Sequence, residues 1–205
     1  MTEAAAPPRR RRPPLLRRQD LLAVTVSCLA RLGPRATTGR EICRQAGVSH
    51  GLLRHYFRNP DNLLLETYEQ LCEDMLAHLA ATLAEAEAAP WDALRRFFEA
   101  VFSREWANGE IIGAWMVFWQ LVRSRADFAA VSQAFNQRQQ ALLERAVASL
   151  PLAGPDDRAA RADAVAILSA VVDGLWIEFY LAPGRTPAAR CVALCEQTAR
   201  RLFAP

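Results

Sequence analysis

Residues 38–57 read TGREICRQAGVSHGLLRHYF, and this stretch decides how the rest of the chain is interpreted. Thr38 with Glu41 three residues later is a capping box that starts a helix. Gly47 tolerates the left-handed backbone that ends this helix, and Ser49 caps a second short helix. Two short helices joined by a tight glycine-containing turn are typical of a helix-turn-helix. The stretch therefore predicts a DNA-binding element, with an ordinary helical hairpin as the alternative.

The second of these helices carries groups that can read DNA. Leu52, Leu53 and Phe57 are expected to pack it on the preceding helices. Hydroxyl, imidazole and guanidinium groups on its remaining face can hydrogen-bond to base edges, and glycine lets the backbone approach closely. Side chains at its end suit phosphate contacts, which set register without reading sequence. The predicted DNA-binding residues are Thr38, Arg44, Ser49, His50, Gly51, Leu52, Arg54, His55, Tyr56 and Arg58.

The basic charge of the chain is concentrated in the half that holds this element. Residues 1–60 carry 12 Arg and three acidic residues, a net charge of +9, whereas residues 61–205 carry 13 Arg and 19 acidic residues, a net charge of −6. A basic head on an acidic body indicates a polyanion partner for the head alone.

Residues 1–14, MTEAAAPPRRRRPP, are expected to form a flexible basic arm, because they hold four prolines and four consecutive arginines and no apolar anchor. We expect the arm to add sequence-independent attraction to DNA phosphates. The alternative is that it enters the minor groove beside the main site.

Hydrophobic periodicity and helix punctuation predict an all-α protein of about nine helices, with no strand pattern. Residues 15–60 are expected to form a three-helix DNA-binding domain, and residues 61–205 a helical domain for ligand binding and dimerisation. The first helix is expected to run from Leu15 to a stop at Gly33 and Pro34. The others are expected at 38–46, 49–57, 60–87, 90–106, 110–123, 126–150, 156–181 and 187–203.

The segment 38–57 also resembles the signature of the TetR family of transcriptional regulators, approximately T-x-x-x-I-A-x-x-A-G-V-S-x-G-x-x-Y-x-Y-F. Two positions differ from the family pattern. Arg54 stands where the family often has Tyr, and Pro60 where it often has a phosphate-contacting Lys, a contact that Arg58 is placed to replace. The matching residues are Thr38, Ile42, Ala46, Gly47, Val48, Ser49, Gly51, Tyr56 and Phe57.

This resemblance implies a homodimeric, ligand-responsive repressor. Its two recognition helices would be spaced about one DNA turn, roughly 34 Å, to meet a palindromic operator. In the family the last two helices pair as a four-helix bundle between subunits. Small residues on the long helix and apolar residues on the last helix suit that pairing. They are Ala170, Gly174, Ala182, Leu194, Leu202 and Phe203.

Two aromatic segments in the second half of the chain supply candidate ligand contacts. They read AWMVFWQL at 114–121 and VDGLWIEFY at 172–180. In a helix, each segment places three candidate ligand-contacting side chains on one face. Aromatic faces with one carboxylate suit an organic cation, above all a quaternary ammonium. The alternative is that the indoles are core and the carboxylate pairs with an Arg. The candidate residues are Trp115, Phe118, Trp119, Asp173, Trp176 and Tyr180.

The same segments resemble the BetI-type branch of the family, whose members are choline-responsive repressors of glycine betaine synthesis. The shared runs are A-W-x-x-F-W, D-G-L-W and, at the end of the helix-turn-helix, H-Y-F. The resemblance implies a choline-like inducer. Related regulators that share W-x-x-x-W sense other ligands, so a bulky hydrophobic or cationic compound, as in efflux or catabolic regulators, is the alternative.

The sequence shows no catalytic constellation, phosphate-binding loop or metal-ligand spacing, so we expect neither an enzyme nor a cofactor or metal. Five cysteines form an odd, sparse set that suits a reducing cytosol. No apolar run approaches the eighteen or so residues of a membrane span, so a cytoplasmic protein is expected. The rivals from other classes are a ligand-free DNA-binding architectural protein and a helical enzyme.

Overall fold

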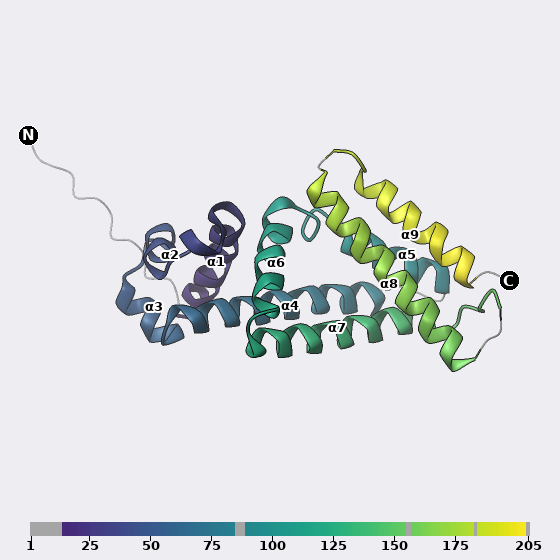
Figure 1. The fold of residues 1–205 in the computed structure, drawn as a ribbon, viewed down its shortest axis with the longest axis horizontal. Coiled ribbons are helices and arrows are strands. Elements are labelled where there is room, and N and C mark those ends of the chain that lie inside the picture. The colour runs from purple at the N-terminus through teal and green to yellow at the C-terminus, as the bar shows by residue number, and fades with distance from the viewer. Residues whose placement is uncertain (1–13, 85–88, 155–156, 183, 204–205) are drawn as a thin grey trace, which may run out of the picture.

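The computed structural model describes residues 14–84, 89–154, 157–182 and 184–203, and within them the chain forms nine α-helices and no strand (Figure 1). The predicted all-α fold is confirmed. The helices are α1 (Pro14–Ala36), α2 (Gly39–Ala46), α3 (His50–Phe57), α4 (Pro60–Ala84), α5 (Pro90–Val101), α6 (Gly109–Val122), α7 (Ala126–Val147), α8 (Arg158–Leu181) and α9 (Ala188–Phe203).

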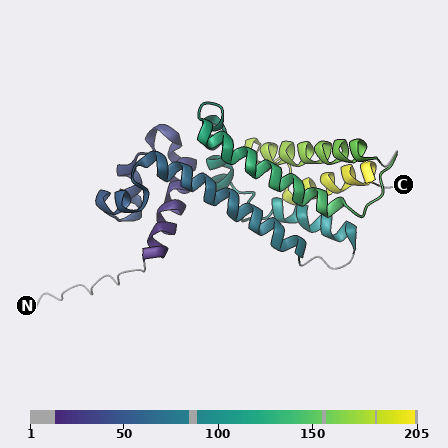
Figure 2. The same cartoon turned by 90° about the horizontal axis from the view of Figure 1, so that it is seen from below.

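Helices α1–α3 form one end of the molecule and α5, α8 and α9 the other, and α4 runs between them (Figures 1 and 2). The small end has its own apolar cluster, built around Ile42, Leu53 and Phe57. The larger cluster fills the rest of the body. Both α1 and α4 contribute to both clusters: Leu21 belongs to the small cluster and Leu29 to the large one. The two ends are therefore joined by shared helices.

Several helix ends differ from the sequence prediction. The predicted stop at Gly33 is a real break, with φ 74° and ψ 174°, yet one more helical turn follows through Ala36. Helix α5 ends at Val101 rather than near Trp106, because the amides of Trp106 and Ala107 turn back to the Ser103 carbonyl at 3.1 and 2.7 Å. This turn buries Trp106 and Ala107 in the body. A buried turn and a continuing helix have the same apolar pattern, so the sequence could not distinguish them.

Two further helix ends differ from the prediction, and three expectations concern residues that the structure does not describe. Helix α6 begins at Gly109, one residue early, because Asn108 caps it, and α7 ends at Val147, three residues before Leu150. The predicted end of the fourth helix at 87, the predicted start of the eighth at 156 and residues 1–13 of the predicted arm (1–14) lie outside the described residues, whereas Pro14 belongs to α1.

Helix α6 lies very close to α1 at Gly113. A Cβ atom on Gly113 would stand 3.3 Å from both Cα and Cβ of Ala30, and 3.4 Å from the hydroxyl of Tyr180 on α8. Such contacts are tighter than ordinary van der Waals packing, so glycine is needed for this approach. The Gly113 contact fixes how the small end, carried by α1, sits on the body.

Helix α8 leaves much of its apolar surface uncovered. By length and composition α8 could cross a membrane, which corrects the expectation that no segment approaches a span. Only 28% of its most apolar 18-residue window is buried, and Ile167 and Leu181 remain 49% and 65% exposed. An exposed apolar face of this kind marks an interaction surface. The predicted interface residues Ala170 and Gly174 lie on it.

Candidate DNA-binding helix and ligand pocket

The hydroxyl caps that the sequence predicts are present in the helix-turn-helix, but the reciprocal half of the predicted capping box is not, because the Thr38 amide donates to the Ala36 carbonyl at 2.9 Å. The Thr38 hydroxyl accepts a hydrogen bond from the Glu41 amide at 3.2 Å, and the Ser49 hydroxyl accepts one from the Leu52 amide, also at 3.2 Å. Gly47 has φ 65°, in the left-handed region, and closes α2. These bonds satisfy helix-end amides and fix where α2 and α3 begin.

Helix α3 presents one polar face to solvent. Leu53 and Phe57 are buried and pack the helix on the small apolar cluster. Leu52 and Tyr56 are half-buried at the edges. The exposed set consists of side chains and backbone that can donate or accept hydrogen bonds at a DNA groove: Ser49, His50, Gly51, Arg54, His55 and Arg58.

Arg44 and Arg58 have specific local roles besides any contact with DNA. Arg44 donates through Nε and a terminal nitrogen to the Glu41 carboxylate at 2.8 and 2.5 Å. These hydrogen bonds, with one from Gln45, lower the pKa of Glu41 to about 2. Arg58 has φ 55° and its amide donates to the Arg54 carbonyl, which closes α3 and leaves its side chain exposed.

Three indoles meet inside the body. The ring centroid of Trp115 lies 6.4 Å from that of Trp119 and 6.3 Å from that of Trp176, and Trp119 and Trp176 are 6.3 Å apart. The ring of Phe135 lies 5.1 Å from Trp115. With Asp173 these side chains line one pocket, called the Trp pocket below; its remaining lining residues are Met75, Val101, Asn136 and Gln139.

Two of the six predicted ligand residues lie elsewhere. Phe118 is fully buried and stacks on Tyr68, with ring centroids 4.7 Å apart, so it belongs to the core. Tyr180 points its hydroxyl at the contact between α6 and α1 near Gly113. Conversely, the wall formed by Phe135, Asn136 and Gln139 was not predicted from the sequence. It comes from α7, where a single aromatic residue in a polar segment gives no signal.

Asp173 supplies the negative charge of the Trp pocket. Among the described residues no basic side chain pairs with it, in contrast to the arginine pairing considered above. Asp173 is itself an exposed residue at the edge of the pocket, and the partial desolvation of its carboxyl by the surrounding protein raises its pKa above the ordinary value. The indole N–H groups of Trp115 and Trp176 are buried and have no acceptor among the described residues. The free volume is about 60 Å³, room for a few waters.

The described residues hold no group of three or more side chains that could bind a metal ion. All five cysteines are buried and free.

Two family models match this chain. One, for bacterial regulatory proteins of the tetR family, covers residues 21–67, and the other, for the C-terminal domain of BetI-type transcriptional repressors, covers residues 90–204. The chain belongs to the TetR family, in its BetI type. The part of the chain that matches the tetR-family model includes α2 and α3.

Curated relatives agree with the family models. The HTH-type transcriptional regulator BetI of Stenotrophomonas maltophilia is 29% identical over 85% of this chain and 86% of its own length. BetI of Paraburkholderia phytofirmans is 30% identical over 86% of this chain and 89% of its own. These relatives are transcriptional regulators and not enzymes, which confirms the expectation that the chain is no enzyme.

Solved structures share the fold. A transcriptional regulator from Pseudomonas aeruginosa PAO1 superposes with a TM-score of 0.79 at 29% identity, over 92% of this chain and 90% of its own. A regulator from Saccharomonospora viridis, solved in complex with choline, has a TM-score of 0.78 at 15% identity, over 92% of this chain and 98% of its own.

Proposed function

We propose that this TetR-family regulator represses transcription as a cytoplasmic homodimer on a palindromic operator, and that a choline-like quaternary ammonium in the Trp pocket releases it. Residues 15–60 carry DNA binding, and residues 61–205 carry ligand binding and dimerisation. The observation that supports a cationic ligand is that three indoles and one carboxylate, from α6 and α8, line the same pocket.

The chemistry of the Trp pocket suits a small organic cation. A cation is attracted to an aromatic face by about 2 kcal/mol when both are desolvated. The carboxylate of Asp173 supplies a counter-charge, and the unpaired N–H groups of Trp115 and Trp176 can donate to a hydroxyl or carboxyl oxygen of the ligand. The free volume of about 60 Å³ favours a small ligand over a bulky drug. Half-buried Trp119 must shift to admit it.

The comparisons support this ligand class. The Saccharomonospora viridis regulator, which shares the fold, is described in complex with choline. The curated relatives at 29–30% identity are BetI regulators. The family model matched by residues 90–204 is that of the BetI-type C-terminal domain, which contains the Trp pocket of this chain apart from Met75.

The uncovered face of α8 supports dimerisation. Ala170 and Gly174 are exposed on it, and a Cβ on Gly174 would meet nothing within 4 Å, so a second helix can approach closely there. Leu194 and Leu202 are half-buried on α9. Phe203 is fully buried within the subunit, so it completes the core and is removed from the expected interface.

The packing of α6 gives a route from the ligand to the DNA. Trp115 and Trp119 lie on α6, and Gly113 on the same helix touches α1. A cation that displaces these indoles would shift α6 and, through the tight contact at Ala30, tilt the small end. The ligand regulates DNA binding only if it binds the tilted arrangement more tightly than the DNA-bound one.

The proposal is tested by measuring operator affinity and thermal stability with and without choline. Choline should raise the Tm and weaken operator binding. Trp119→Ala and Asp173→Asn should each weaken choline binding about tenfold or more while operator binding without ligand is kept. An uncharged isostere of choline should bind less well. Trp91→Ala is the control, because Trp91 lies on α5 beside Arg200, outside the pocket.

The proposal fails if folded wild-type protein shows no change in Tm or operator affinity at saturating choline. It also fails if Trp91→Ala weakens choline binding as much as the pocket variants do. In either case the indoles would be core and the inducer a different compound.

A further inference from the structure

The Trp pocket is closed on its inner side and open on its outer side. Trp115, Trp176 and Phe135 are buried and form inner walls. Asp173 of α8 and Asn136 of α7 also line the pocket, and both are exposed. The pocket therefore has a mouth between α7 and α8, and polar side chains form its rim.

Asp173 lies where two faces of α8 meet. Residues three apart are neighbours on the surface of a helix. Trp176, three residues after Asp173, is buried and lines the pocket. Ala170, three residues before Asp173, belongs to the exposed apolar face. The carboxylate at the rim of the ligand pocket is thus also at the border of the face on which dimerisation is proposed.

The exposed face beside Asp173 has the shape that a second helix needs. Ala162, Ala166, Ala170 and Gly174 stand at every fourth position of α8, and all four are exposed. Small residues at this spacing form a shallow stripe along which another helix can approach closely. Ile167, beside the stripe, is 49% exposed, and burial against a partner would remove it from water. Helix α8 lies at the outer edge of the body, where a partner can reach it (Figure 2).

The composition of this face favours a second copy of the chain as its partner. Residues 164–177 carry a single charged side chain, that of Asp173. A partner surface must therefore be almost uncharged, apolar and flat, and the same face of another copy has these properties. A surface that matches itself in this way suits a two-fold interface between identical subunits.

We propose that a second copy of the chain, packed on the exposed face of α8, closes the mouth of the Trp pocket, so that each ligand site is complete only in the dimer. The inference rests on the proposed function, from which it takes the ligand and the dimer. Asp173 directly precedes Gly174 and follows Ala170 by three residues. A helix that lies on Ala170 and Gly174 therefore also reaches the rim of the pocket.

Closure of the mouth strengthens the binding of a cation. Water screens the attraction between a carboxylate and a cation, and this attraction grows as water is excluded. The attraction of a cation to an indole face grows in the same way. The ligand therefore binds the dimer more tightly than the monomer, and by reciprocity it stabilises the dimer. The same interface sets the spacing of the two α3 helices, so the ligand acts where that spacing is decided.

The first test is calorimetric titration of full-length wild type and Ile167→Glu with choline, after thermal unfolding has verified that the variant is folded. The monomer formed by Ile167→Glu should bind choline about tenfold more weakly. The new carboxylate would by itself attract the cation, so its charge cannot cause this loss. Leu32→Glu adds the same charge at an exposed position on α1 and should bind choline like the wild type.

A second test does not depend on how Ile167→Glu folds. Sedimentation over a dilution series gives the dimer dissociation constant, with and without saturating choline at equal ionic strength. A tenfold preference for the dimer at each of two sites should tighten the dimer about a hundredfold. Ile167→Ala, which weakens the face without adding a charge, brings the equilibrium into range where the wild type does not dissociate.

A third test needs no ligand. All five native cysteines are buried, so a maleimide reports on an introduced exposed thiol. Asp173→Cys should react several-fold more slowly as a dimer than when it is combined with Ile167→Glu. Ala77→Cys, at an exposed position on α4, is the control and should react equally fast in both backgrounds.

The proposal is overturned if the folded Ile167→Glu monomer binds choline like the wild type, or if the Asp173→Cys thiol reacts equally fast in both backgrounds. Each subunit would then bind its ligand alone, and the proposed function would stand. If the wild-type dimer binds no choline, the ligand assignment fails instead, and the thiol measurement still decides whether the partner covers the mouth.

Discussion

Arg54 is the side chain of α3 best suited to reading a base. It is exposed, and within the described part of the chain no hydrogen bond holds its side chain. We expect Arg54→Ala to cost about 1–3 kcal/mol of operator binding and to relax preference at one base pair in each half-site. Affinity measured on operator and on random DNA checks this. An equal loss on both would show that Arg54 contacts only phosphate.

At Gly51 the effect of an added side chain on folding can be separated from its effect on DNA binding. A Cβ there would meet only the Ser49 hydroxyl, at 3.8 Å, so the fold accepts alanine, which also has the higher helix propensity. We expect Gly51→Ala to keep or raise the Tm while operator affinity falls about tenfold, because the added methyl holds the backbone away from the groove. Unchanged affinity would mean that α3 does not approach DNA at this residue.

Asp173 should make ligand binding depend on pH. Desolvation raises the pKa of its carboxyl, so the group gains a proton at a higher pH than an ordinary aspartate. Choline keeps its charge at every pH, and it needs the ionised carboxylate. Choline affinity should therefore be full well above the raised pKa and fall as the pH drops through it. Titrations between pH 4.5 and 8 check this, and the Asp173→Asn variant should show a weak, flat profile.

At the scale of elements, the approach of α6 to α1 depends on Gly113. Alanine there would place its Cβ 3.3 Å from backbone and side-chain atoms of Ala30, so one helix must move. We expect Gly113→Ala to destabilise the protein by about 1–3 kcal/mol despite alanine's better helix propensity. Gly109→Ala, with nothing within 4 Å of the new Cβ, is the control. Thermal or urea unfolding measures both, and equal effects would contradict this account.

The contact at Gly113 also bears on regulation. A displaced α6 changes how the small end sits on the body, so Gly113→Ala should alter the response of operator binding to choline more than it alters choline binding itself. The two ends share α1 and α4, which makes them respond together.

At the scale of the whole molecule, the exposed apolar face of α8 sets the expected assembly. Ile167→Glu places a charge in the middle of that face and should convert a dimer to a 22.8 kDa monomer. Operator affinity should fall with it, because two half-sites are no longer held together. Sedimentation at micromolar concentration measures this. Leu32→Glu, at an exposed position on α1, should leave the mass unchanged, and a wild-type monomer would refute the assembly.

The sequence by itself determined the helix-turn-helix, its caps and the family. Those features depend on bonds between neighbours in the chain, such as Thr38 with Glu41 and Ser49 with Leu52. Residue type and spacing therefore specify them before the chain folds. Spacing also predicted that Trp115 shares a helical face with Trp119, and Asp173 with Trp176, because i, i+3 and i+4 positions lie on one side of a helix.

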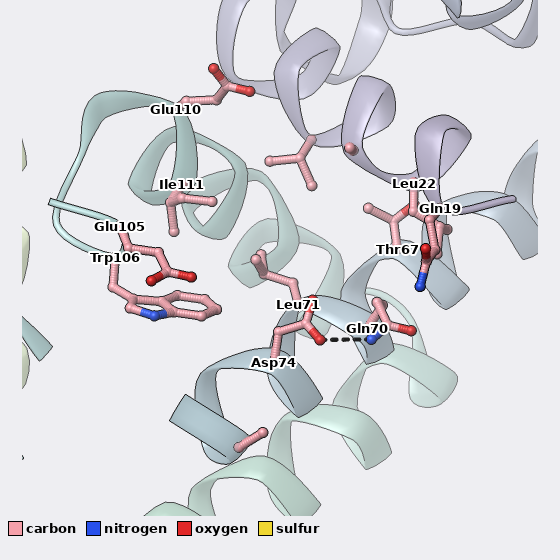
Figure 3. A pocket seen from close by; sticks show the side chains of 13 residues that line it. Gln19, Leu22, Thr67, Gln70, Leu71, Asp74, Glu105, Trp106, Glu110 and Ile111 are labelled. Atoms are coloured by element: carbon pink, nitrogen blue, oxygen red, sulfur yellow. Dashed lines mark hydrogen bonds between the residues drawn. The ribbon is translucent and has the colours of Figure 1, made fainter. Parts of the chain in front are cut away.

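Only the tertiary structure decided which elements meet. It placed Phe118 in the core beside Tyr68, and brought Phe135 of α7 into the Trp pocket. It ended α5 at Val101, because the following turn packs Trp106 into the body. It also left a cavity of about 590 Å³ between α1, α4 and residues 105–111 (Figure 3). Each outcome depends on packing between residues far apart in the chain. Periodicity reports which face of a helix is apolar, and the partner of that face is settled only when the helices pack.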